Sequence, residues 1–428
     1  MLRIISIILT GIITSFYFFP FVPTFLPIAN TKMVLAAMGL VVLGFKLASG
    51  QRAEINKDFF KLSLFAIGVS LAGIIAVILN ETRDYTYASY IMSMWVWLGG
   101  AYFVINCIKW VHGNASVRLV AHYLIGVCVA QCIIAYTMGQ YTPLKNLVDS
   151  FVASEGFMGK VEGRLYGIGA ALDVAGMRFA AVLLIIGYLC AGLKNRIEPR
   201  LQWFYIISFC VIVLIGNMIG RTTTVGAALA LLFMLFVTLK ERNDNTLSFW
   251  RKLSLMLLIF VPIIVYLYNT NPAMYNNLRF AFEGFFNMFE KGEWETTSNT
   301  ILLDMFRFPD NFKTWMIGDG YFDNPKDSDP YFIGEITAGF YMATDVGYCR
   351  FLFYFGILGT LAFTYFMFYA TKVCVRRYTN YKMMFVLILL LNYVVWLKVA
   401  SDLFPVLALF LCVTPNENDE QDEDKLLV

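Results

Sequence analysis

Charged residues are scarce in this chain of 428 residues: Asp, Glu, Lys and Arg make up 15% of it, against 59% hydrophobic residues. So large an apolar share exceeds what a soluble protein of this size needs. The composition therefore argues against a soluble enzyme and predicts an all-α protein that crosses a membrane many times. The formal net charge of +3 decides little, because the side on which charges lie matters more than their sum.

Histidine is almost absent, and the familiar motifs of metal and phosphate chemistry are missing. The two histidines, His112 and His122, fall on the cytoplasmic side of the topology given below, which excludes histidine chemistry on the other face. The sequence holds no zinc-ligand cluster, nucleophile elbow or phosphate-binding loop. Its eight cysteines lie in or beside apolar runs, which argues against a disulfide framework. We expect no metal and no cofactor.

Long apolar runs are abundant, with the length of about 17 to 25 residues that suits membrane-spanning helices. Twelve spans are predicted, at 4–20, 31–48, 60–79, 89–108, 117–138, 174–193, 201–219, 222–239, 253–268, 346–370, 383–397 and a short 402–413. The chain thus divides into nine spans within 1–268, a large polar loop with short helices at 269–344, three spans within 345–413, and an acidic tail at 414–428.

Basic residues mark every second connection between these spans. The basic connections hold Lys46, Arg52, Lys57 and Lys61; Lys109 and Arg118; Lys194, Arg196 and Arg200; Lys240, Arg242, Arg251 and Lys252; and Lys372, Arg376, Arg377 and Lys382. The short alternate connections hold only Lys32, Arg83, Arg221 and Lys398. The positive-inside rule then places both ends of the chain in the cytoplasm and the segments 139–173 and 269–344 outside.

Arg221 is the first candidate for chemistry, because it stands in the tight outer turn 216–224 between two spans. Charges at a membrane edge are costly and tend to be functional. An arginine there can hold phosphate oxygens through two hydrogen bonds, and Gly220 and Thr222 allow close approach and add a donor. The alternative is an arginine that merely reaches the membrane interface.

The outer segment 139–173 supplies a second arginine, Arg164, within a glycine-rich stretch that also holds Tyr166. Asp173 and Arg178 follow at the start of the next span. The glycines make the backbone around Arg164 adaptable, and Tyr166 offers a platform for a sugar ring. An ordinary surface arginine near a helix entrance is the alternative.

The large loop adds further candidates for contacts with a substrate, namely Arg279, Arg307, Trp315, Tyr321 and, just after the loop, Tyr348. Phenylalanines near helical spacing predict an amphipathic helix at 277–290, lying either on the membrane surface or against the bundle. A second helix is expected at 298–308, where Pro309 stops it.

Several carboxylates could accept a proton on the outer side: Asp173, Asp319, Asp323, Glu335 and Asp345. Of these we take Asp319 and Asp345 as catalytic candidates beside Arg164 and Arg221, while the residues alone do not assign the base. Arginines gathered at the outer face suit a membrane-anchored diphosphate, which is already a good leaving group and needs its charge neutralised. The attacking hydroxyl needs at most one positioned carboxylate.

Three patches of this sequence resemble bacterial O-antigen and capsular polysaccharide polymerases of the Wzy type, in the superfamily that also holds O-antigen ligases. They are 163–169 with Asp173 and Gly176; Gly220-Arg221-Thr222-Thr223; and 314–323 continued by 345–348 and Gly356. The plan of about 12 spans with one large outer loop before the last few matches along the whole chain.

The resemblance implies a GT-C-type glycosyltransferase fold and a multi-pass protein of the bacterial inner membrane with its active site on the periplasmic face. It implies that Arg164 and Arg221 hold the diphosphate of an undecaprenyl-linked oligosaccharide repeat unit. The growing glycan would pass from its carrier to an incoming lipid-linked unit. A flippase and a chain-length regulator are expected partners besides membrane lipids, and nucleic acid is not.

Two alternatives remain. A ligase of the same superfamily transfers finished glycan to lipid A core or protein, but such ligases carry an important histidine in the large outer loop, and this chain has none there. A lipid-linked oligosaccharide transporter, or flippase, needs charges along a path through the spans. Here charge gathers at the outer rim instead, which favours the polymerase.

Overall fold

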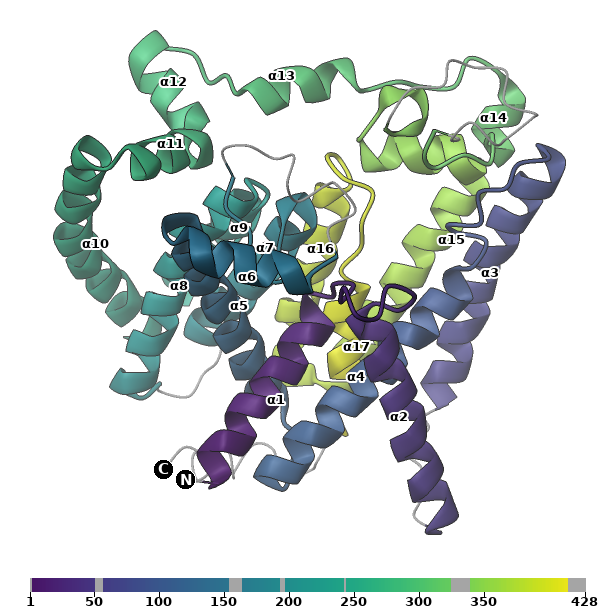
Figure 1. The fold of residues 1–428 in the computed structure, drawn as a ribbon, viewed down its shortest axis with the longest axis horizontal. Helices are drawn as coiled ribbons and strands as arrows, with labels where there is room; N and C mark the ends of the chain where they lie inside the picture. The colour runs from purple at the N-terminus through teal and green to yellow at the C-terminus, as the bar shows by residue number, and fades with distance from the viewer. Residues whose placement is uncertain are drawn as a thin grey trace.

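The computed structural model describes residues 2–50, 57–153, 164–192, 197–241, 244–324 and 339–414, which form helices joined by turns and short irregular segments (Figure 1). The α-helices are α1 (Leu2–Phe18), α2 (Thr31–Ala48), α3 (Lys57–Leu79), α4 (Tyr90–His112), α5 (Val117–Gln140), α6 (Thr142–Phe151), α7 (Leu172–Ala191), α8 (Pro199–Ile219), α9 (Thr223–Glu241), α10 (Asp244–Thr270), α11 (Pro272–Ala281), α12 (Glu283–Lys291), α13 (Thr297–Asp304), α14 (Phe312–Ile317), α15 (Gly347–Arg377), α16 (Lys382–Val395) and α17 (Phe404–Cys412). The predicted helical, polytopic membrane character is confirmed.

A helix forms within each of the twelve predicted spans, but they are unequal in length. Nine helices of the described chain are long and apolar enough to cross a membrane: α2, α3, α4, α5, α7, α8, α9, α10 and α15. The others, α1, α16 and α17, have 17, 14 and 9 residues. The figure of twelve complete spans therefore stays a prediction.

The break between α16 and α17 explains why the last apolar run is short. Its backbone is irregular over residues 396–403, where the indole N–H of Trp396 donates to the carbonyl of Ser401 at 2.7 Å. The side chain of Asn392 accepts from the backbone N–H of Leu403 at 2.8 Å. Side chains of the protein thus satisfy part of this non-helical backbone, and the segment carries Lys398.

Connections that the charge pattern assigns to one side of the membrane contact one another. On the predicted outer side, the backbone N–H of Ala153, after α6, donates to the carbonyl of Val22 between α1 and α2 at 2.8 Å. On the predicted inner side, Arg377 at the end of α15 pairs with Asp58 at the start of α3 at 3.2 Å. Each contact joins connections that the charge pattern assigns to the same side, while the side of the membrane itself stays a prediction.

Helices α11 to α14 form a strap, residues 272–317, that runs across one face of the bundle from α10 to α15 (Figure 1). The helix expected at 277–290 is two helices, α11 and α12, with the break at Phe282, and the helix expected at 298–308 is the shorter α13. The far end of the strap docks on α15, where the backbone N–H of Gly320 donates to the carbonyl of Tyr354 at 3.0 Å.

Helix α7 is the centre of the bundle, since every residue from Ala175 to Ala191 is buried. It packs closely on α9, where a Cβ added at Gly226 would lie 2.2 Å from the Cα of Ala180. Small residues permit such backbone approach between membrane helices, which associate through packing rather than through a hydrophobic force.

We expect Gly226→Ala to push α9 away from α7 and to destabilise the protein by about 1 to 3 kcal/mol, as overpacking does. Thermal unfolding of the purified protein in detergent would measure the loss. Gly126→Ala in α5 is the matched control, because nothing lies within 4 Å of a Cβ added there. An equal effect of both substitutions would contradict the packing argument.

Candidate functional site

Two arginines from distant parts of the chain meet on the face that the strap covers. Arg164 lies in an extended segment whose next residue, Leu165, donates its backbone N–H to the carbonyl of Met218 at 3.1 Å. This bond places Arg164 beside the end of α8, and Arg221 follows in the turn between α8 and α9. Both guanidinium groups face the ring of Phe280 on α11, at 4.7 and 4.6 Å from its centroid. The two arginines that the resemblance names therefore lie at the same ring, and their role in holding a diphosphate stays a prediction.

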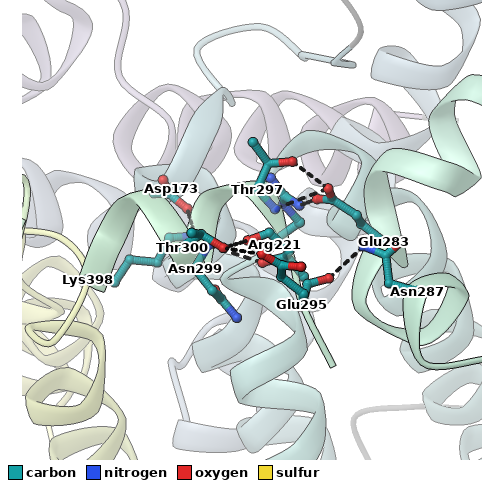
Figure 2. A network of polar contacts seen from close by, with 10 residues as sticks. Asp173, Arg221, Glu283, Asn287, Glu295, Thr297, Asn299, Thr300 and Lys398 are labelled. Carbon is teal, nitrogen blue, oxygen red and sulfur yellow. Dashed lines mark hydrogen bonds and ion pairs between the residues drawn. The ribbon is translucent and has the colours of Figure 1, made fainter. Parts of the chain in front are cut away.

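The strap contributes a carboxylate to this arginine pair. Glu283, the first residue of α12, forms an ion pair with Arg221 and also accepts hydrogen bonds from the backbone N–H of Thr297 at 3.1 Å and from its hydroxyl at 2.7 Å (Figure 2). Burial raises the pKa of Glu283, but the Thr297 hydrogen bonds and the charge of Arg221 outweigh it, so the pKa lies below its ordinary value. The glutamate is therefore ionised at neutral pH.

An open pocket of about 370 Å³ lies between the strap and Arg221. It is lined by Arg221, Arg279, Phe280, Glu283, Phe286, Asn287 and Thr297. Arg279 pairs with Glu290 at 2.6 Å, so each arginine of the pocket has a glutamate of α12 as its partner. Two cations and aromatic walls suit a ligand with an anionic group and an apolar or sugar portion.

A second polar cluster adjoins Arg164 and Arg221. Asp173, in the first turn of α7, accepts from the ammonium of Lys398 at 2.9 Å and from the hydroxyl of Thr222 at 2.5 Å. The negative charge of Asp173 also acts on Arg164. Burial lowers the pKa of Arg164, Asp173 raises it, and the nearby charge of Arg221 lowers it. The cluster thus joins α7, the α8–α9 turn and the irregular segment before α17.

Asp345 lies at the entrance of α15, close enough to Asp173 and Lys398 to feel their charges. Burial raises its pKa to about 6, although Arg350 at 3.8 Å works in the opposite direction. One of its buried oxygens, Oδ1, has no hydrogen-bond partner in the part of the chain that the structure describes. Arg350 itself is held at 2.6 Å by Asp323 and packs on Phe322.

Other predicted residues dock the strap instead of meeting the arginines. The Asp319 carboxylate accepts from the Thr314 hydroxyl at 2.6 Å and from the Tyr341 hydroxyl at 3.2 Å, and within the described residues no hydrogen bond or ion pair joins it to Arg164 or Arg221. Tyr321 stacks on Tyr341 at 5.3 Å. Trp315, by contrast, stacks on Phe308 at 6.0 Å. The block 314–323 therefore fixes the strap to α15.

No hydrogen bond or ion pair within the described residues joins the remaining candidates to Arg164 or Arg221. Arg178 is buried within α7 and donates to the carbonyl of Phe18. The hydroxyl of Tyr166 donates to Asp149 of α6 at 2.8 Å, the hydroxyl of Tyr348 donates to a backbone carbonyl of α16, and Arg307 is exposed between α13 and α14. Glu335 lies outside the described residues.

Sequence reasoning missed three members of the site: Lys398, Glu283 and Phe280. Lys398 carried a signal, because it is a rare basic residue in a connection assigned to the outer side. Glu283 and Phe280 carried none, since they belong to an amphipathic stretch whose docking partner the sequence does not show. No group of three or more His, Cys, Asp or Glu side chains gathers as a metal site within residues that the structure describes.

We expect Asp345→Asn to stabilise the protein by about 1 kcal/mol at pH 7.5 and hardly at all at pH 4. The reason is that the pKa of Asp345 rises from 3.8 to about 6 on folding. Ionising this carboxyl in the folded protein therefore carries a free-energy cost, which is absent below pH 3.8 and complete above pH 6. Partial exposure and the lost partner of Arg350 reduce the effect. Thermal unfolding at the two pH values would measure it, and equal shifts at both would refute it.

Comparison of the chain with protein-family models, with curated proteins and with solved structures finds no match in any of the three. The case for a function therefore depends on the geometry described above: an arginine pair beside an open pocket, a lysine–aspartate–threonine cluster, and a half-buried carboxylate with a raised pKa, all on one polar face of a membrane bundle.

Proposed function

We propose that this protein is a polysaccharide polymerase of the GT-C type, which transfers a growing glycan from undecaprenyl diphosphate to an incoming lipid-linked repeat unit on the periplasmic face of a bacterial inner membrane. The observation that carries the proposal is the meeting of Arg164 and Arg221 at the ring of Phe280. Two fixed guanidinium groups at a membrane edge stabilise the charge that develops on a departing diphosphate. The likeness of their sequence patches to Wzy-type polymerases supports the same role.

In the proposed reaction, a hydroxyl oxygen of the incoming unit attacks the anomeric carbon of the donor glycan. The bond from that carbon to the diphosphate oxygen breaks, and the bonding electrons leave with the diphosphate, which Arg164 and Arg221 hold. The hydroxyl proton passes to a carboxylate. Water-poor surroundings strengthen each of these electrostatic contacts.

Asp345 is the carboxylate that best suits the role of base. Asp173 is held by Lys398 and Thr222, and Asp319 by Thr314 and Tyr341. Asp345 keeps an oxygen without a hydrogen bond among the described groups, and its pKa of about 6 lies near neutral pH, where a general base works best. Asp173 lies in electrostatic range of both Arg164 and Asp345, which links the base to the diphosphate site.

We expect Arg221→Ala to abolish long glycan chains, because the leaving diphosphate loses a main counter-charge. The measurement is the chain-length ladder of surface glycan in a deletion strain that carries the variant, with membrane insertion checked by immunoblot. The deletion strain itself separates the candidate functions: single repeat units indicate a polymerase, unattached polymer a ligase, and no surface repeat a flippase. A normal ladder in the variant would remove Arg221 from the diphosphate site.

Arg221→Lys should restore activity poorly, to about a tenth or less of normal, since an ammonium cannot replace the planar two-point contact of a guanidinium. The rate of polymer formation in vitro from lipid-linked repeat units would measure the recovery. Lys313→Arg on the strap is the control, because it exchanges lysine and arginine at a position that does not line the pocket. Full activity of Arg221→Lys would show that only a positive charge is needed at the membrane edge.

A further inference from the structure

Glu283 divides its two carboxylate oxygens between different partners. Oε2 pairs with the guanidinium of Arg221, while Oε1 accepts from the backbone N–H of Thr297 at 3.1 Å and from its hydroxyl at 2.7 Å. Figure 2 shows Arg221 and Thr297 converging on this carboxylate. The glutamate can therefore release Arg221 and still remain anchored to Thr297.

The two arginines differ in whether a carboxylate of the protein already pairs with them. The side chains of Arg221 and Glu283 are only 15% and 24% exposed, so their ion pair is partly shielded from water and stronger than a surface pair. Arg164 packs on Phe280 and forms no ion pair with an acid in the described part of the chain. An incoming anion thus finds Arg164 open, but it must displace a carboxylate from Arg221.

We propose that Glu283 is a specificity-determining residue that makes the arginine pair select diphosphates over single phosphate groups. The proposal rests on the proposed function and adds the means by which the site chooses its lipid. A single phosphate bound at Arg164 gains Arg221 only in exchange for Glu283. A diphosphate places its second phosphoryl group beside Arg221 once the first is bound, and this high local concentration displaces the carboxylate.

Membrane phospholipids are the competing ligands that this discrimination would exclude. They surround the protein in large excess, and the commonest of them, phosphatidylethanolamine and phosphatidylglycerol, offer a single phosphate in each headgroup. An uncovered pair of arginines at the membrane edge would bind them and leave the site blocked. A carboxylate placed against one arginine repels the wrong ligand at little cost to the right one, which is a recognised route to specificity.

The test compares binding of farnesyl diphosphate and farnesyl phosphate to the purified full-length protein in detergent by calorimetry. For the wild type we expect the diphosphate to bind about 100-fold more tightly. Glu283→Gln keeps the hydrogen bonds to Thr297 and removes the charge, so farnesyl phosphate should bind about 10-fold more tightly and the preference should fall about 10-fold. Glu283→Ala should act in the same direction and serves if the glutamine variant is poorly folded.

Glu293→Gln is the matched control, because it neutralises an exposed glutamate of the same strap that does not line the pocket. Its diphosphate preference should stay within about twofold of the wild type. An unchanged preference in both Glu283 variants, with diphosphate binding intact, overturns the role of Glu283 and leaves the proposed function standing. Failure of the wild type to bind farnesyl diphosphate overturns the proposed function and this role with it.

Discussion

Close backbone contact between the start of α7 and the α8–α9 turn is the constraint on which the site depends. A Cβ at Gly220 would lie 2.4 Å from the carbonyl oxygen of Leu172, and one at Gly176 would lie 2.9 Å from the carbonyl oxygen of Gly220. Only glycine permits these approaches. Because the two backbones touch, Asp173 reaches Thr222 in the turn, and Arg221 next to it comes within range of Arg164. A larger residue in either place would separate the cation pair from its acidic neighbours.

The sequence was a good guide to the bundle and a partial guide to the site. Apolar runs identified where the helices of the bundle form, because these runs follow directly from the cost of exposing polar groups to lipid. Arg221 was singled out because lone charges at a membrane edge are informative, and the family resemblance joined Arg164 to it. Asp319 was chosen as a catalytic candidate, and its carboxylate accepts hydrogen bonds from the hydroxyl groups of Thr314 and Tyr341. Glu283 acquires meaning only through the docking of α12, which no local pattern encodes.

Ion pairs within the protein balance most of the positive charge of the site. Three of its cations, Arg221, Arg279 and Lys398, each pair with a carboxylate on another helix or turn of the structure. These pairs hold the strap and the last irregular segment in place while keeping the cations close to the pocket. In such surroundings a multivalent anion exchanges one set of ion pairs for another and needs little reorganisation of the protein.

Helix α10 connects the strap to the part of the protein that faces lipid. It has 27 residues and is about 40 Å long, but its apolar part, 253–268, is only about 24 Å long, which is shorter than the hydrocarbon core of a bilayer. Its long row of exposed apolar side chains, from Leu255 to Tyr266, faces away from the bundle. A short apolar stretch is accommodated by local thinning of the bilayer or by flanking side chains that reach the interface, and α11 and α12, which bear Phe280 and Glu283, continue directly from the end of α10. The thickness of the host membrane therefore influences how closely the strap approaches the arginine pair.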